Sequence, residues 1–116
     1  MSPGGFAYMK SVEDLMLLDF YGNLLTDKMR DCLELYLNDD LSLAEIADDA
    51  GISRQGAHDT VKRALSQLHS YEEKLGLVAR FSEQKKIVEE AITYIDNKDY
   101  DNASRVLAEL KNDLED

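Results

Sequence analysis

The sequence predicts an all-α fold, a helix-turn-helix bundle without a wing that is followed by a C-terminal helical hairpin. Three observations support this prediction. Leu, Ala, Glu, Lys and Asp are frequent among the 116 residues, whereas there is one Pro and no Trp, which favours helix over strand. Apolar residues recur at helical spacing through most of the chain. Capping residues and glycines interrupt that spacing where helices should begin and end.

The first 41 residues contain two predicted helices. Residues 1–10 are small and Gly-rich, and we expect a flexible N-terminal segment. Ser11 and Asp14 form a capping box that starts a helix from Val12 to about Tyr21. Its buried side is expected to be Leu15, Leu18 and Tyr21. Thr26 caps a second helix, DKMRDCLELYLN, whose apolar stripe consists of Met29, Cys32, Leu33, Tyr36 and Leu37.

The stretch from Leu41 to Leu65 has the pattern of a helix-turn-helix. Ser42 and Glu45 form a capping box that opens the short helix LAEIADDA. Ala47 supplies the small residue that two crossing helices need where they touch, and Gly51 supplies a turn with positive φ. Ser53 caps the next helix, which we expect to end at Leu75 before Gly76. The expected core contacts of the two helices are Ile46, Ala50, Ile52, Ala57, Val61, Leu65, Leu68 and Leu75.

The leading half of the second of these helices is the candidate nucleic-acid surface, because such a helix can enter a major groove. Asp59 shares the outward side with the candidate binding residues. A tight helical corner with no ligand is the alternative interpretation. The candidate binding residues are Ser53, Arg54, Gln55, His58, Lys62 and Arg63.

Two domains are predicted, a helix-turn-helix domain over residues 11–76 and a hairpin over residues 77–116. In the hairpin, NKDY is the expected turn between two amphipathic helices. Their apolar residues can pack on the first domain, or the hairpin can extend that domain and join two copies as a homodimer. The two stripes are Phe81, Val88, Ala91, Ile92 and Ile95, and Ala103, Val106, Leu107, Leu110 and Leu114.

Several function classes have no support in the sequence. We expect no enzyme, no cofactor and no metal site, since His58 and His69 lack companions for a metal set and the phosphate-loop motif GxxxxGK[ST] is absent. The longest apolar run, LMLL, is too short to span a membrane. Cys32 is the lone cysteine, and its place on an apolar stripe indicates a buried thiol in a reducing compartment, so a cytoplasmic location is expected.

The net charge of −11 argues against tight binding to free DNA. Residues 41–70 carry three cationic and four anionic side chains, whereas residues 1–40 and 71–116 each have a net charge of −5. Each phosphate contact contributes about −0.9 to the salt slope of binding to duplex DNA, and three cations supply few such contacts. Duplex DNA is therefore expected to bind weakly, and a basic protein or a ribonucleoprotein is the favoured partner.

The chain resembles two bacterial families. From Leu25 to Leu68, LTDKMRDCLELYL and LSLAEIADDAGISRQGAHDTVKRALSQL resemble region 4 of sigma factors. Over Leu17 to Phe81 the chain is more similar to the YlxM family, through DFY at Asp19 to Tyr21, SRQ at Ser53 to Gln55 and YEEKLGL at Tyr71 to Leu77. Gly56 and Thr60 depart from the usual helix-turn-helix pattern.

The YlxM resemblance implies an accessory protein of the signal recognition particle pathway. Members of this family are typically encoded with the particle's GTPase, Ffh, or its receptor, FtsY, and are thought to modulate assembly or GTP hydrolysis. The resemblance therefore implies Ffh, FtsY or the particle RNA as partners. The sigma-factor resemblance implies the alternative function, a sequence-specific DNA-binding transcriptional regulator.

Overall fold

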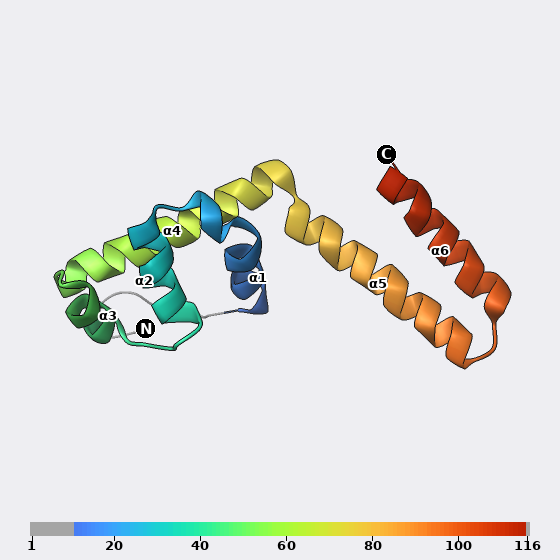
Figure 1. Ribbon diagram of the computed structural model, residues 1–116, viewed down its shortest axis with the longest axis horizontal. Helices are drawn as coiled ribbons and strands as arrows, with labels where there is room; N and C mark the ends of the chain where they lie inside the picture. Colours follow the sequence, from blue (N-terminus) through green and yellow to red (C-terminus); the bar gives the residue numbers. More distant parts are fainter. Residues whose placement is uncertain (1–10, 116) are drawn as a thin grey trace. The chain divides into compact units, whose positions relative to one another are not determined.

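The computed structural model describes residues 11–115, which contain six α-helices, one short 3-10 helix and no strand. The expected flexible segment, residues 1–10, lies outside the described residues. The chain divides into two compact units, one up to Gly76 and one from Leu77 onwards. Both units are built from helices alone, so the predicted all-α class is confirmed (Figure 1).

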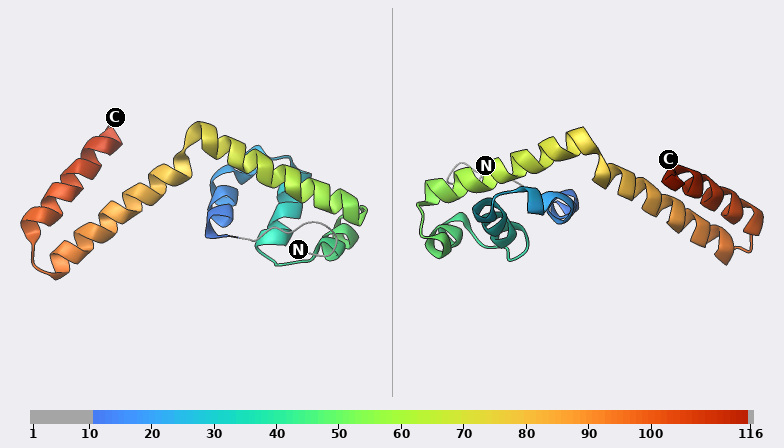
Figure 2. Two further views of the ribbon diagram at one scale, coloured as in Figure 1. Left: turned by 180° about the vertical axis from the view of Figure 1, so that it is seen from behind. Right: turned by 45° about the horizontal axis from the view of Figure 1, so that its top comes forward.

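The first unit contains α1 (Val12–Tyr21), the 3-10 helix η1 (Gly22–Leu24), α2 (Asp27–Leu37), α3 (Leu43–Ala50) and α4 (Arg54–Leu75). The long helix α4 organises this unit, because α1, α2 and α3 all pack against it (Figure 2). Side-chain caps start each of these α-helices, at Ser11, Thr26, Ser42 and Ser53. The helix boundaries expected from the capping residues are therefore confirmed.

The core of the first unit lies between α4 and the three helices packed on it. All five residues expected on the stripe of α2 are buried, including Cys32. Burial raises the pKa of the Cys32 thiol, which keeps it in the neutral form that suits a core position. The remaining buried apolar residues of this unit are Leu17, Leu18, Tyr21, Leu25, Ile46, Ala47, Ala57, Val61, Ala64, Leu65 and Leu68.

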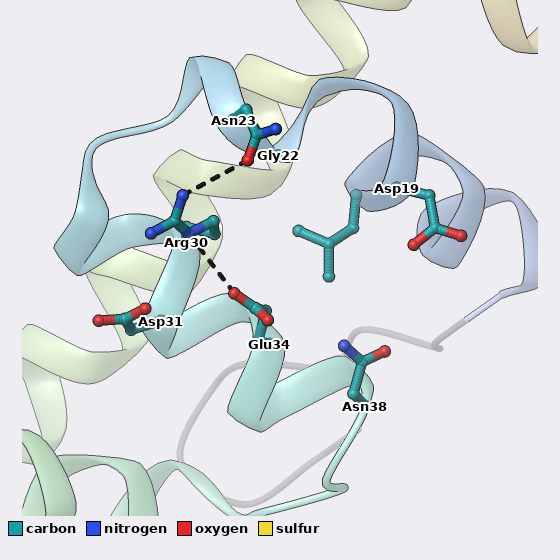
Figure 3. Close-up of a pocket in the computed structure, with 8 residues that line it drawn as sticks. Asp19, Gly22, Asn23, Arg30, Asp31, Glu34 and Asn38 are labelled. Carbon is teal, nitrogen blue, oxygen red and sulfur yellow. Dashed lines mark hydrogen bonds and ion pairs between the residues drawn. The ribbon is translucent and has the colours of Figure 1, made fainter.

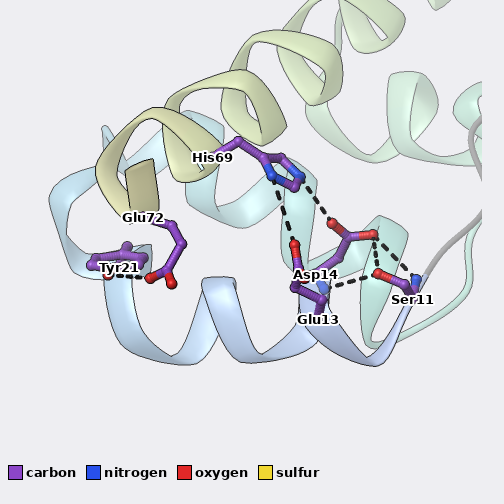
Figure 4. A network of polar contacts seen from close by, with 6 residues as sticks. All are labelled: Ser11, Glu13, Asp14, Tyr21, His69 and Glu72. Atoms are coloured by element: carbon purple, nitrogen blue, oxygen red, sulfur yellow. Dashed lines mark hydrogen bonds and ion pairs between the residues drawn. The ribbon is translucent and has the colours of Figure 1, made fainter. Parts of the chain in front are cut away.

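Polar contacts fasten α1 to α4 (Figure 4). Asp14 is buried, and its carboxylate accepts hydrogen bonds from the Ser11 backbone N–H and hydroxyl. The other carboxylate oxygen of Asp14 lies 3.2 Å from Nε2 of His69 on α4. Two turns further along α1 and one turn further along α4, the Tyr21 hydroxyl donates a 2.6 Å hydrogen bond to Glu72. The N-terminal capping box of α1 is thus also part of its docking site on α4.

Three expected core positions are wrong. Leu15 is exposed and Leu17 is fully buried, because the inward stripe of α1 begins at the polar residue Asp14, which hydrophobic spacing does not identify. Ala50 is exposed because it is the last residue of α3, where the chain turns into Gly51. Leu75 is exposed because it lies beyond the turn of α4 where Glu72 meets α1.

The second unit is a hairpin of α5 (Leu77–Asp96) and α6 (Tyr100–Glu115), two antiparallel helices that lie side by side (Figure 1). The expected NKDY turn lies between them, with Tyr100 as the first residue of α6. Lys98 takes a positive φ of 60° in this turn, and the Asp99 side chain accepts from the Asn102 backbone N–H near the start of α6. None of the helices within residues 11–115 is long and apolar enough to cross a membrane.

Candidate nucleic-acid interface

The turn between α3 and α4 is set by Gly51. This residue ends α3 with φ 68° and ψ 34°, the left-handed conformation predicted for it. Its backbone N–H donates to the carbonyl of Ala47, and the N–H of Ile52 donates to the same oxygen at 3.0 Å. Ala47 is buried, as the crossing of two helices requires. The helix-turn-helix pattern therefore has the expected backbone geometry.

Gly56 and Thr60 have structural roles that account for their departure from the usual pattern. The Ser53 hydroxyl accepts a 2.9 Å hydrogen bond from the Gly56 backbone N–H, and a Cβ at Gly56 would lie only 3.1 Å from that hydroxyl oxygen. Thr60 is buried, and its hydroxyl donates to the Gly56 carbonyl at 2.7 Å. Gly56 thus gives room to the Ser53 cap, and the Thr60 hydroxyl is satisfied within its own helix.

The structure brings the predicted site residues together on the first three turns of α4. Ser53, Arg54, Gln55, Lys62 and Arg63 are exposed, and the His58 side chain is 18% exposed. A hollow of about 270 Å³ lies where α4 begins, lined by Leu43, Arg54, Gln55 and His58. Leu43, the first residue of α3, was not among the predicted site residues. The signal that could have identified it is its position at the start of the first helix of the helix-turn-helix.

Asp59 is the residue that changes the chemistry of this face. Its carboxylate oxygen accepts a 3.0 Å hydrogen bond from the Gln55 amide and lies 3.2 Å from Nδ1 of His58. Hydrogen bonding by His58, followed by that of Gln55, lowers the pKa of the Asp59 carboxyl below its usual range. Asp59 is therefore anionic near neutral pH, and it contacts two of the candidate binding residues, Gln55 and His58.

Unlike Gln55 and His58, the three cationic side chains of this face have no contact with Asp59 shorter than the ion-pair limit. Within residues 11–115, Arg54, Lys62 and Arg63 form no ion pair. Their charges are thus available to an anionic ligand, although Asp59 lies between them in the sequence. The face combines three free cations with one fixed carboxylate, so it can contact a few phosphates but cannot neutralise a long run of them.

A second polar surface of the first unit lies between α1, η1 and α2 (Figure 3). It is a groove of about 350 Å³ with the acidic side chains Asp19, Asp31 and Glu34 and one cation, Arg30. Arg30 is engaged by Glu34 at 3.5 Å and by Asp27 at 3.2 Å. Asp19 and Asp31 have no ion-pair partner in the described part of the chain, so we name this surface the acidic groove. Sequence spacing did not identify it, because its residues come from three elements, α1, η1 and α2.

Comparison with known proteins places these features in a family. The family model of UPF0122, described as "Putative helix-turn-helix protein, YlxM / p13 like", matches residues 8–110. A UPF0122 protein of Desulforamulus reducens is 44% identical over 104 residues, which cover 89% of each chain. One of Acetivibrio thermocellus is 47% identical over 95 residues, covering 82% of this chain and 81% of the relative. One of Symbiobacterium thermophilum is 40% identical, covering 89% of this chain and 97% of the relative. The chain therefore belongs to the UPF0122 family of YlxM/p13-like helix-turn-helix proteins.

Proposed function

We propose that this protein is a non-enzymatic accessory protein that associates with the signal recognition particle and modulates protein targeting. The observation that carries the proposal is the charge distribution: the exposed face of α4 has Asp59 and three cations that form no ion pair within residues 11–115, in a chain with a net charge of −11. The resemblance to YlxM supplies the identity of the partner, which is Ffh, its receptor FtsY or the particle RNA.

The electrostatics favour a basic protein or a ribonucleoprotein over free duplex DNA. The potential of a strongly acidic chain repels a long polyanion and accelerates the encounter with a basic surface. The acidic groove is a local site that is negative like the chain as a whole, and its Asp19 and Asp31 can bind Arg or Lys side chains of such a partner. A short RNA segment bound to that basic protein is compatible with the cations of α4.

Binding to purified components tests this proposal. We expect the full chain to bind Ffh, the Ffh–RNA complex or FtsY in titrations at physiological salt, with at most weak and sequence-independent binding to duplex DNA. The affinity should fall as the salt concentration rises, because opposite charges drive the encounter. No affinity for any of the three components would contradict the proposal.

Two variants of the α4 face separate an RNA contact from a protein contact. Arg54→Glu together with Lys62→Glu reverses two exposed cations, and we expect weaker binding to the Ffh–RNA complex with unchanged stability. Asp59→Asn removes the negative charge of the carboxylate that Gln55 and His58 contact, so binding to RNA should strengthen. If neither variant alters the affinity for RNA, the face is not a nucleic-acid surface and the partner is contacted elsewhere.

The second candidate function is a sequence-specific DNA-binding transcriptional regulator. One observation favours it: Arg54 and Gln55 are exposed in the first turn of a helix that follows a helix-turn-helix turn. Side chains at this place contact base edges in proteins that bind the major groove. Nanomolar, sequence-dependent binding to a promoter fragment, together with no affinity for particle components, would establish this function in place of the first.

A further inference from the structure

The hairpin of α5 and α6 has an apolar face that its own two helices leave uncovered. Only four of its apolar residues are buried within the described chain: Val78, Ala91, Ala103 and Val106. Eight larger ones are between 40% and 61% exposed: Leu77 and Tyr100, the first residues of the two helices, and six others. The six others are Phe81, Val88, Ile92 and Ile95 on α5, and Leu107 and Leu114 on α6.

The apolar residues of each hairpin helix, together with Lys85 on α5, follow the spacing of a helical-bundle seam. On α5 the stripe is Phe81, Lys85, Val88, Ile92 and Ile95, with alternating steps of four and three residues. On α6, Ala103, Leu107, Leu110 and Leu114 repeat the same steps. This alternation holds the seam of one helix against a second helix.

The two stripes face the same side of the hairpin. A groove of about 340 Å³ between the helices is lined by Phe81, Gln84, Lys85, Val88, Leu110 and Leu114. Such a groove accepts the side chains of a facing helix. We name the surface formed by the two stripes the hairpin face.

The hairpin face is large enough for a stable pair of copies. The exposed parts of its six large apolar residues amount to on the order of 500 Å², which is within the roughly 300–600 Å² of the largest apolar patch on a typical monomer, and such a patch often has a function. With the polar rim included, this is comparable to the roughly 800 Å² per partner of a standard interface. Two hairpins joined in this way make a four-helix bundle, an arrangement in which seams of this spacing are buried.

The charges along α5 favour a second copy of this chain as the partner that covers the hairpin face. Residues 77–86 carry three cations and one anion, whereas residues 87–96 carry three anions and no cation. This order opposes the helix dipole, which favours anions at the start and cations at the end. In an antiparallel pair of α5 helices, the basic half of each copy lies against the acidic half of the other. A parallel pair would place like charges together.

We propose that two copies of this protein pair through the hairpin face, with their α5 helices antiparallel and related by a two-fold axis near Val88. Each copy then covers the exposed stripe of the other, and Lys85 of each lies beside the acidic half of its neighbour. A closed two-fold contact of this kind uses the same surface on both copies, so it makes a dimer and no larger assembly.

The oligomeric state of the full chain is the first test. Sedimentation equilibrium over about a hundredfold range of concentration should show a reversible dimer, twice the 13.1 kDa of one chain. Val88→Glu places a carboxylate in the exposed stripe and should weaken dimerisation at least about tenfold, while the first unit still unfolds cooperatively. The matched control is Asn112→Glu, on the opposite side of α6, which should leave the dimer unchanged. A monomer at all concentrations, or a dimer that tolerates Val88→Glu, overturns the proposal.

Disulfide trapping tests the orientation. In a Cys32→Ala background, Phe81→Cys on one copy and Ile95→Cys on the other should become cross-linked when the two chains are mixed under mild oxidation. Neither variant should form the cross-link efficiently alone, because an antiparallel pair separates identical positions at the two ends of the stripe. Efficient cross-linking of Phe81→Cys with itself would indicate parallel helices and overturn the antiparallel arrangement.

Discussion

At the residue scale, Gly51 shows how a single position can be predicted with its conformation. Ala47 lies four positions before Gly51, and the Ser53 cap lies two positions after it. This spacing predicts a left-handed turn between two helices at Gly51, and the observed φ is 68°. Apart from Gly51 itself and its two chain neighbours, no described residue has an atom within 4 Å of the place where a Cβ would stand, so the requirement for glycine comes from the backbone conformation.

We predict that Gly51→Val destabilises the first unit by roughly 1–3 kcal/mol, because a β-branched residue adopts positive φ poorly. Urea denaturation followed by circular dichroism measures the change. Gly51→Asn is the matched control, since asparagine tolerates the left-handed region, and it should lose clearly less stability. Equal losses in the two variants would mean that the turn conformation does not limit the stability of the motif.

The exposed positions of the candidate site were predictable, but its internal contacts were not. Helical spacing placed Arg54, Gln55 and Lys62 on the outside of α4, and all three are exposed. The hydrogen bond from Gln55 to Asp59 depends on which rotamers the side chains take, and spacing does not determine that. The pairing of His69 with Asp14, 55 residues earlier in the chain, needs the packing of two helices and was likewise outside what the sequence revealed.

At the element scale, capping chemistry was a better guide than apolar periodicity. The starts of α1, α2, α3 and α4 follow directly from a Ser or Thr side chain that accepts a backbone hydrogen bond. On α1 one expected buried position, Leu15, was wrong, because the inward stripe begins with the carboxylate of Asp14, which contacts His69 of α4. A local signal fixes a helix end, whereas the buried face of a short helix depends on its neighbours.

The docking of α1 on α4 leads to the second prediction. Tyr21→Phe removes the 2.6 Å hydrogen bond to Glu72 and should lower the free energy of unfolding by about 1–2 kcal/mol, because the tyrosine is buried and its acceptor is a carboxylate. Tyr71→Phe is the matched control: its hydroxyl makes a 3.5 Å, exposed contact with the Leu24 carbonyl, so its loss should be smaller. Thermal denaturation of both variants makes the comparison, and a larger loss for Tyr71→Phe would contradict this account of α1.

At the scale of the whole molecule, the two units differ in how much apolar surface each buries. Among the described residues, sixteen buried apolar residues belong to the first unit and four to the hairpin. Sequence periodicity found both apolar stripes of the hairpin but could not tell whether they would be covered, because periodicity marks an apolar face and not its partner. The first unit therefore has the core expected of an independently folding domain, and the hairpin does not.

This difference predicts opposite behaviour when the units are separated. A chain that ends at Gly76 should unfold cooperatively and stay monomeric, since its core lies within residues 11–76 and it lacks the hairpin face. A peptide of residues 77–116 should be weakly helical when dilute and gain helix as its concentration rises, because association buries the stripe that one hairpin exposes. Circular dichroism across a dilution series measures both. If the hairpin peptide were fully helical and monomeric when dilute, the few residues that it buries would suffice for its stability, and its exposed stripe would not be needed to hold the two helices together.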